Sequence, residues 1–212
     1  MKKLLLITLT PIILMFVFSG ITFVIAQQEG LIHKEFVVIN ASQEEVWNYL
    51  SDNRNAASWS VFFDHITTLD SDGDDIKEGG VGSVRRCYRF ADESGITWDE
   101  DTVKIEPYSF RQIHTYNIQN WPFEDFNALE FDVFQTYEKL GANQTKLSFS
   151  TSLKMPQTAY AKWMFYSAKW ETLRIFRVNL ENIKAHIEQG QVANYNRPHP
   201  WEDIALIEKV MM

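Results

Sequence analysis

One stretch of the sequence carries most of the information about the fold: Val37-Val38-Ile39-Asn40-Ala41-Ser42-Gln43-Glu44-Glu45-Val46-Trp47. Its β-branched start completes a predicted strand from His33 to Ile39. Ser42 then stands where a helix N-cap is expected, and Glu45 follows three residues later, which is the spacing of a capping box. The stretch therefore predicts a strand that passes directly into an amphipathic helix.

Strand signals dominate the middle of the chain. Six further segments rich in β-branched and aromatic residues lie between clusters of turn residues: His65–Leu69, Gly82–Phe90, Ile96–Ile105, Phe110–Ile118, Ala128–Leu140 and Thr145–Lys154. The connections between them are too short for parallel crossovers, so with the first strand we expect about seven antiparallel strands. A second short helical segment is predicted over Ala56–Phe63.

After Met155-Pro156 the apolar residues change from the period of a strand to that of a helix. Gln157–Glu188 contains no glycine or proline, and it predicts one helix of 32 residues that ends near Gly190. Residues 190–212 are expected to form an irregular tail. Because no repeat or flexible linker interrupts residues 31–189, we expect this part of the chain to be one α+β domain.

The N-terminal segment, residues 1–26, is predicted to lie outside this domain. Lys2 and Lys3 precede an uncharged run, Leu4–Ala26, of 23 residues, which as a helix would be about 35 Å long and able to cross a bilayer. Two interpretations remain open: a signal peptide cleaved after Ala26, or a retained membrane anchor. Both place the remainder in an extracytoplasmic location, periplasmic or secreted, because the lysines hold the N-terminus inside.

Composition excludes several classes of function. The 212 residues, 45% of them hydrophobic, are enough for one domain with a real core. The net charge of −8 makes nucleic acid a poor partner. The single cysteine, Cys87, cannot form an internal disulfide and is expected to be a small core residue. The acidic run Asp70–Asp75 lacks the pattern of an EF-hand, so we expect a solvated turn and predict neither a metal nor another cofactor.

The order of these elements resembles the helix-grip fold of the SRPBCC superfamily, which includes START, polyketide cyclase/dehydrase and plant-allergen-like proteins, over Leu31–Gln189. The opening stretch quoted above is similar to the superfamily's first strand and helix. Two further motifs are similar to signposts of the polyketide-cyclase-like branch: Gly79-Gly80-Val81-Gly82-Ser83-Val84-Arg85, and Trp98-Asp99-Glu100-Asp101 followed by Glu106-Pro107. The resemblance implies a curved seven-stranded antiparallel sheet wrapped on a long C-terminal helix, with a cavity between them for an apolar molecule.

Glu100 is the first candidate site residue. Trp98 and Thr102 share its strand face by the two-residue alternation of a strand, and the resemblance implies an inward-pointing carboxylate here. A buried glutamate beside an aromatic ring would have a raised pKa and could act as a general acid or hold a ligand hydroxyl. Alternatively, Glu100 is a solvated strand residue or is paired with Arg85 or Arg86.

His114 and Tyr116 share one face of another predicted strand. They could supply an acid/base group and an oriented hydroxyl. The opposite face, with Ile113, Thr115 and Asn117, is equally mixed in character, so alternation does not decide which face turns toward the cavity.

The predicted C-terminal helix adds a third group of candidates. Residues spaced by three and four share one side of the helix, and the resemblance implies a cavity-facing asparagine there: Ala168, Thr172, Ile175 and Asn179. The first half of the helix is aromatic on more than one face, with Tyr160, Trp163 and Trp170, and the loop 120–127 carries Trp121. These rings are either buried under loops or frame the cavity mouth, where they contact a membrane surface or a hydrophobic partner.

Three functions follow as hypotheses. The leading one is a non-enzymatic domain that binds and transports a hydrophobic small molecule or lipid, with Glu100, Asn179 and Tyr116 orienting its polar end. The second is a polyketide cyclase/dehydrase-like enzyme in which Glu100 works with His114 or Tyr116 as acid and base. The third is a protein-interaction module whose cavity is closed by side chains. Fold alone does not decide among them.

Overall fold

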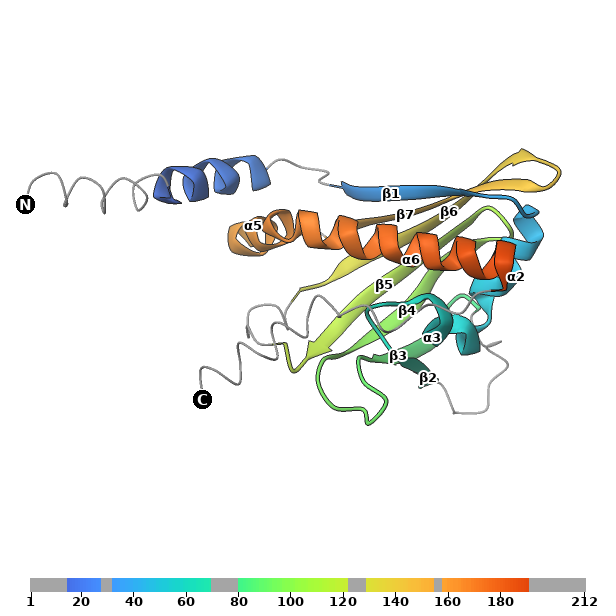
Figure 1. Ribbon diagram of the computed structural model, residues 1–212. Helices are drawn as coiled ribbons and strands as arrows, with labels where there is room; N and C mark the ends of the chain where they lie inside the picture. The colour runs from blue at the N-terminus through green and yellow to red at the C-terminus, as the bar shows by residue number, and fades with distance from the viewer. Residues whose placement is uncertain (1–14, 28–31, 70–79, 122–128, 155–157, 191–212) are drawn as a thin grey trace, which may run out of the picture.

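The computed structural model describes residues 15–27, 32–69, 80–121, 129–154 and 158–190. Its centre is an antiparallel sheet of seven strands in the order β1-β7-β6-β5-β4-β3-β2 (Figure 1). The strands are β1 (Ile32–Ile39), β2 (His65–Thr68), β3 (Val84–Tyr88), β4 (Thr97–Glu106), β5 (Phe110–Gln119), β6 (Phe131–Gly141) and β7 (Gln144–Leu153). The prediction of about seven antiparallel strands is confirmed, with small differences at their ends.

The capping signal after β1 is also confirmed. The hydroxyl of Ser42 accepts a hydrogen bond from the backbone N–H of Glu45 at 3.2 Å, and α2 (Gln43–Ser51) follows directly. A 3-10 turn, η1 (Asn53–Asn55), and α3 (Ala56–Trp59) come next. They place a short helical layer between the sheet edge and the C-terminal helix.

The second helical segment is shorter than the predicted Ala56–Phe63. It stops at Trp59 because Ser60 has an extended backbone. The hydroxyl of Ser60 accepts hydrogen bonds from the N–H groups of Phe62 and Phe63, at 3.0 and 3.1 Å, in place of the helical carbonyls.

The long C-terminal helix is not continuous, contrary to the prediction. It consists of α5 (Ala159–Ser167) and α6 (Lys169–Gln189), which meet at Ala168, where ψ is −3°. The side chain of Thr172 donates a hydrogen bond to the carbonyl of Ala168 at 3.1 Å, a contact that favours bending. Because neither glycine nor proline marks this junction, the sequence pattern did not reveal it. α6 ends at Gly190, as predicted, with a left-handed φ of 65°.

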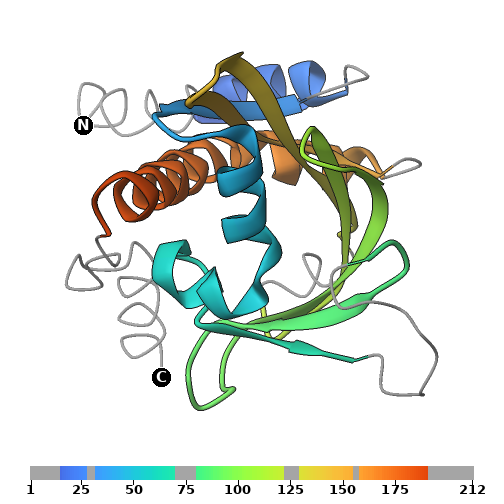
Figure 2. The same cartoon turned by 90° about the vertical axis from the view of Figure 1, so that its right-hand side faces the viewer.

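The sheet is curved, and α6 lies across its concave side (Figure 1). The helix packs on β1, β7 and α3. Viewed along α6, the strands β3 to β6 bend away from the helix (Figure 2). The contacts of α6 with the sheet are therefore concentrated on β1 and β7.

Two clusters of buried apolar side chains form the core. The larger joins β1, α2, β6, β7 and α6: Val37, Ile39, Ala41, Val46, Trp47, Leu50, Trp59, Tyr137, Leu147, Phe149, Leu180 and Ile183. The smaller lies around β3, β4 and β5: Cys87, Ile96, Trp98, Ile118, Leu129 and Ala161. Cys87 is fully buried, as expected for a small core residue.

Residues 15–26 form a helix that extends away from the domain on the side of α5 (Figure 1). Two hydrogen bonds join it to α5: the indole N–H of Trp163 donates to the hydroxyl of Thr22 at 3.1 Å, and the side-chain amide of Gln27 donates to the carbonyl of Ala159 at 3.0 Å. Among the described helices, none combines the length and the hydropathy needed to cross a membrane.

Some predictions concern residues outside the described part of the chain. They are the first part of the apolar N-terminal run, the acidic turn Asp70–Asp75, most of the loop 120–127 and the tail beyond Gly190.

Candidate ligand-binding site

A cavity of about 520 Å³ lies between the concave face of the sheet and the helices α5 and α6. Its wall is mostly apolar: Trp59, Phe62, Phe63, Ile96, Trp98, Ile113, Ile118, Trp121, Leu129, Phe131, Val133, Phe149, Met164, Phe165, Ala168, Ile175 and Phe176. A smaller set of lining residues is polar: Arg85, Glu100, Thr115, Gln135, Thr151, Ser167, Glu171, Thr172 and Asn179. A size of this order and a few polar groups in an apolar wall are typical of small-molecule sites.

Strand register explains why these side chains meet. Glu100 on β4, Thr115 on β5 and Phe131 on β6 are direct neighbours across the sheet. Residues opposite each other in an antiparallel sheet point to the same face. The fold therefore brings residues that are far apart in sequence onto one wall of the cavity.

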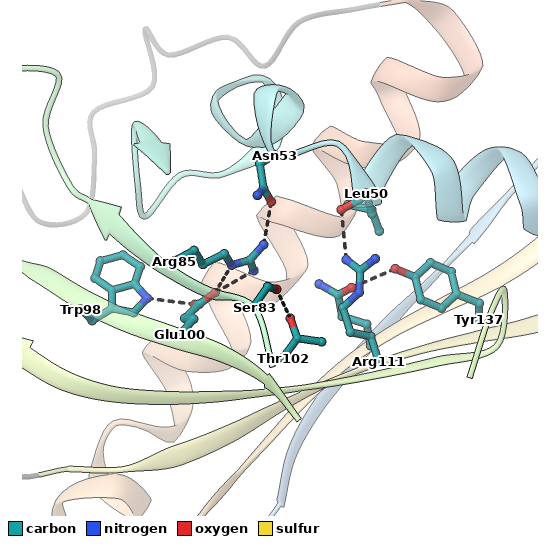
Figure 3. A network of polar contacts seen from close by, with 10 residues as sticks. Leu50, Asn53, Ser83, Arg85, Trp98, Glu100, Thr102, Arg111 and Tyr137 are labelled. Carbon is teal, nitrogen blue, oxygen red and sulfur yellow. Dashed lines mark hydrogen bonds and ion pairs between the residues drawn. The ribbon is translucent and has the colours of Figure 1, made fainter. Parts of the chain in front are cut away.

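Two of the polar lining residues, Arg85 and Glu100, form an ion pair (Figure 3), and we call the part of the cavity that they line the ion-pair end. The guanidinium of Arg85 donates from Nε and Nη2 to Oε2 of Glu100, at 2.9 and 2.7 Å, and from Nη1 to Oδ1 of Asn53 at 2.8 Å. The indole N–H of Trp98 donates to Oε1 of Glu100 at 2.9 Å. Burial alone would lower the pKa of Arg85, but attraction to Glu100 and the hydrogen bonds to it, together with contributions from Cys87 and Tyr137, outweigh burial and the pKa is raised.

Glu100 therefore combines two of the interpretations offered for it: it faces the cavity, and it is paired with an arginine. The side chain is 11% exposed, lines the cavity, and is also paired with Arg85. Both carboxylate oxygens already accept hydrogen bonds from neighbouring side chains. This is the arrangement of a fixed structural ion pair, and it leaves Glu100 poorly placed to donate a proton to a ligand.

A second buried network borders the same end. The hydroxyl of Tyr137 donates to Oε1 of Gln135 at 2.8 Å. The guanidinium of Arg111 donates to the carbonyl of Leu50 at 3.2 Å and to the hydroxyl of Ser51 at 2.6 Å. Burial lowers the pKa of Arg111, while burial raises the pKa of Tyr137 above its usual range. Gln135 is the member of this network that lines the cavity.

The helix candidates lie where the sequence placed them. The structure brings all four of them onto the cavity wall: Ala168, Thr172, Ile175 and Asn179. Asn179 is buried, and its Oδ1 accepts a hydrogen bond from the backbone N–H of Val61 at 2.9 Å. This bond fixes the orientation of the amide.

Other strand candidates are not brought to the cavity. Trp98 lines it, but Thr102 is buried beside Ser83, whose hydroxyl lies 3.4 Å from that of Thr102, and it is not among the lining residues. The lining residues Ile113 and Thr115 show that the concave face of β5 carries the odd-numbered positions there. Sequence alternation could not show which face of β5 turns toward the cavity, because both faces are buried there: His114 on one and Thr115 on the other.

His114 and Tyr116 therefore lie on the convex face of the sheet, which corrects the idea that they work with Glu100 on a ligand. Nδ1 of His114 is 3.1 Å from Oδ1 of Asp132, and Nε2 is 3.0 Å from Nζ of Lys154. The ring of Tyr116 stacks on that of His114 at 5.4 Å.

The aromatic residues near α5 divide into two groups. Phe165 is buried and lines the cavity with Trp121. Trp170 is 81% exposed and Tyr160 is 44% exposed, so neither is covered by the described part of the chain. The cavity approaches the surface between these groups, where Ser167 is an exposed lining residue.

Sequence reasoning missed Arg85 and Gln135 as site residues. Arg85 was considered only as a partner for Glu100, although the adjacent strands place it directly opposite Glu100. Gln135 sits in a strand with apolar residues on both faces, so no pattern in the sequence distinguished it. Among the described residues, no group of three potential metal ligands gathers at any site.

Fold and site together define an α+β helix-grip protein with an internal, largely apolar cavity. The family described as polyketide cyclase/dehydrase and lipid transport matches residues 33–188. The chain belongs to this family, and its resemblance to the polyketide-cyclase-like branch of the SRPBCC superfamily is confirmed. Among curated proteins, none matches the sequence.

Solved structures share the fold at low sequence identity. DynU16, a protein in the dynemicin biosynthetic locus, aligns with a TM-score of 0.55 and 19% identity over 78% of this chain and 50% of its own. The di-domain ARO/CYC BexL from the BE-7585A biosynthetic pathway aligns with a TM-score of 0.53 and 12% identity over 75% of this chain and 47% of its own. A protein from Arthrobacter aurescens aligns with a TM-score of 0.55 and 16% identity over 81% and 93% of the two chains. The chain spans about half the length of DynU16 and BexL, and these similarities concern the fold alone.

Proposed function

We propose that this protein binds a hydrophobic small molecule or lipid in the cavity and carries it, outside the cytoplasm. The observation that supports this most directly is the cavity itself, which is about 520 Å³ in volume and mainly apolar. Each Å² of apolar ligand surface buried there would contribute about 25 cal/mol, so burial would supply most of the affinity. The third hypothesis, a module filled by its own side chains, has less support because the interior is open.

Cyclase or dehydrase activity is the second candidate, and the family description favours it. Within the described part of the chain, the charged groups that line the cavity are Arg85, Glu100 and Glu171. Glu171 is near the mouth and is paired with Arg174 at 2.6 Å. An enzyme would therefore depend on Arg85 and Glu100. A Glu100→Gln variant that keeps ligand binding but loses turnover of a polyketide-like substrate would favour this alternative.

The proposed location rests on the N-terminal segment. The uncharged run Leu4–Ala26 follows two lysines, and large apolar side chains of residues 15–24 are exposed. Exposed apolar side chains at this density are costly in water and are stabilised in a bilayer. Fusion of the first 40 residues to alkaline phosphatase tests the location: we expect an active fusion, and an inactive one would reject export.

Native mass spectrometry of the full chain, purified from its own host, tests the binding function. We expect an additional mass from a bound small molecule. An Ala168→Trp variant fills the cavity and should lose this mass, whereas Glu181→Trp, on an exposed position of α6, should retain it. Two outcomes would contradict the proposal. One is an additional mass that is still bound to the Ala168→Trp variant, and the other is the lack of any additional mass on both the parent chain and the Glu181→Trp variant.

A further inference from the structure

Asn179, Gln135 and Glu100, three polar residues that line the cavity, share one chemical property: their side-chain acceptor atoms are already used. Asn179 accepts the N–H of Val61 through Oδ1, which leaves its amide N–H groups as the polar part of the side chain that is free. The orientation of this amide is unambiguous because a backbone N–H can only donate. Within the described chain, no partner accepts from Nδ2 of Asn179.

Gln135 repeats this arrangement on the opposite wall. Its Oε1 accepts the hydroxyl of Tyr137, so its Nε2 is the end that remains to donate. No described residue accepts from Nε2 of Gln135. Two carboxamides, one on α6 and one on β6, thus line the same cavity with their oxygens engaged and their N–H groups available.

In the ion pair, too, the acceptor atoms are already occupied. Glu100 lines the cavity, but Oε1 is occupied by Trp98 and Oε2 by two bonds from Arg85 (Figure 3). A guanidinium has five N–H groups, and three bonds from Arg85 are to protein partners, Glu100 and Asn53. The carboxylate is therefore shielded while the guanidinium retains donors.

The charge balance at this end favours the same kind of ligand. Arg85 is neutralised by Glu100. Arg111, which is 4% exposed, donates to two uncharged oxygens, and its Nε has no partner among the described residues. The buried groups beside the cavity end therefore carry an excess of positive charge, which attracts a partial or full negative charge in the cavity.

From this set of donors we infer that the cavity selects amphipaths whose polar end is a hydrogen-bond acceptor oxygen, a ketone carbonyl or a carboxylate, held by Asn179, Gln135 and Arg85, and discriminates against amines. The inference rests on the proposed function, since it names the chemistry of the ligand that the cavity binds. At Asn179, Gln135 and Arg85 an amine would meet N–H groups instead of acceptors, and one or two buried donors would remain unpaired, which costs about a tenfold loss of affinity or more. The hydroxyls of Thr115 and Thr151, which line the cavity without a partner among the described residues, can donate or accept and so do not distinguish the two kinds of ligand.

Displacement of 1,6-diphenyl-1,3,5-hexatriene, a fluorescent hydrocarbon without a polar group, from the full chain held in amphipol tests the inference. Three competitors of equal chain length separate the chemistries: 2-decanone as a neutral acceptor, decanoate as an anionic acceptor and decylamine as a donor. We expect 2-decanone or decanoate to bind at least about tenfold more tightly than decylamine. The ranking of decanoate against 2-decanone shows which of the two acceptors is the better match.

Matched variants connect the preference to these residues. Gln135→Glu replaces the free donor with an acceptor at nearly constant shape, and it should reduce the ratio of acceptor to amine affinity at least about tenfold. Gln144→Glu makes the same change at the exposed first residue of β7 and should leave the ratio unchanged. Asn179→Asp is the second test if Gln135→Glu does not fold.

The outcomes separate the two proposals. Equal affinity for decylamine and the two acceptors, or a ratio unchanged in both Gln135→Glu and Asn179→Asp, overturns the donor-set inference and leaves cavity binding intact. Failure of 1,6-diphenyl-1,3,5-hexatriene to bind, or binding that is unaffected by Ala168→Trp, instead counts against the proposed function.

Discussion

Glu100 and Arg85 form an ion pair whose members depend on each other because both are largely buried. Their side chains are 11% and 14% exposed. A buried charge whose partner is removed has neither water nor a counter-ion around it. The loss of folding free energy is then larger than the net contribution of the intact pair. The pair therefore fixes the wall of the cavity more than it stabilises the fold.

Glu100→Leu should lower the free energy of unfolding by about 3–5 kcal/mol, because it leaves Arg85 buried without its carboxylate. The double variant Glu100→Leu with Arg85→Met should recover most of this loss. Urea denaturation measures both. Glu106→Gln breaks the exposed pair with Lys104 and should cost no more than about 1 kcal/mol. A single variant as stable as the parent would show that the pair is solvated.

His33 is the second residue with a measurable signature. It is 2% exposed, stacks on Phe165 with ring centroids 4.3 Å apart, and neither ring nitrogen has a hydrogen-bond partner among the described residues. Desolvation, with a smaller contribution from the charge of Lys169, lowers the pKa of His33 from 6.5 to about 4. The folded chain thus holds a neutral imidazole that the unfolded chain would protonate.

The sign of the pH dependence follows from this difference. Between pH 6.5 and 4 the unfolded chain binds a proton at His33 that the folded chain does not, so stability falls as the pH is lowered through this window, by up to about 3 kcal/mol. In urea denaturation at several pH values, His33→Phe should remove that part of the slope. His65→Gln, at a partly exposed histidine, should keep it. Parallel slopes for the parent and His33→Phe would show that His33 titrates normally.

At the scale of elements, the N-cap of α2 is the clearest test of the opening sequence signal. Ser42→Ala removes the acceptor for the N–H of Glu45 and should lower the free energy of unfolding by about 1 kcal/mol. Ser42→Asp keeps a capping oxygen and should restore the parent value. Urea denaturation of the three chains makes the comparison, and equal stability of Ser42→Ala and the parent would argue that the cap is not formed in solution.

The elements also show what sequence patterns can and cannot predict. The antiparallel strands joined by short connections and the cap at Ser42 depend on neighbours in the chain, and both were predictable. Which face of a strand is buried depends on what packs against it. Trp98, Asp99 and Glu100 are all buried, so both faces of β4 are covered there and the alternation of apolar and polar residues does not identify the inner face. The break at Ala168 depends on a side-chain bond from Thr172, which carries no compositional signal.

The same distinction between local and long-range contacts explains which site residues could be predicted. The candidates on α6 share the cavity wall because helical spacing fixes a shared side, and one side of α6 faces the sheet. Arg85 and Gln135 became site residues through cross-strand register and through partners distant in sequence, Asn53 and Tyr137. Such contacts arise only when the whole sheet has formed.

At the scale of the whole molecule, the topology makes the packing along α6 uneven. α6 packs on β1 and β7, and Ile183 is completely buried in the larger cluster. Toward its N-terminal end the same helix faces open volume, and Ile175 lines that volume. One element therefore serves as a core helix along one part of its length and as a cavity wall along another.

This division predicts different costs for the same substitution. Ile183→Ala should lower the free energy of unfolding by about 2–5 kcal/mol, because it opens a void in a filled core. Ile175→Ala should cost less, about 1–2 kcal/mol, because the removed atoms border space that is already open and the wall loses contacts on one side only. Urea denaturation of both variants, with near-constant m-values as the check on two-state unfolding, measures the difference. Equal costs at the two positions would mean that the interior around Ile175 is filled in solution, and the cavity on which ligand binding depends would then be absent.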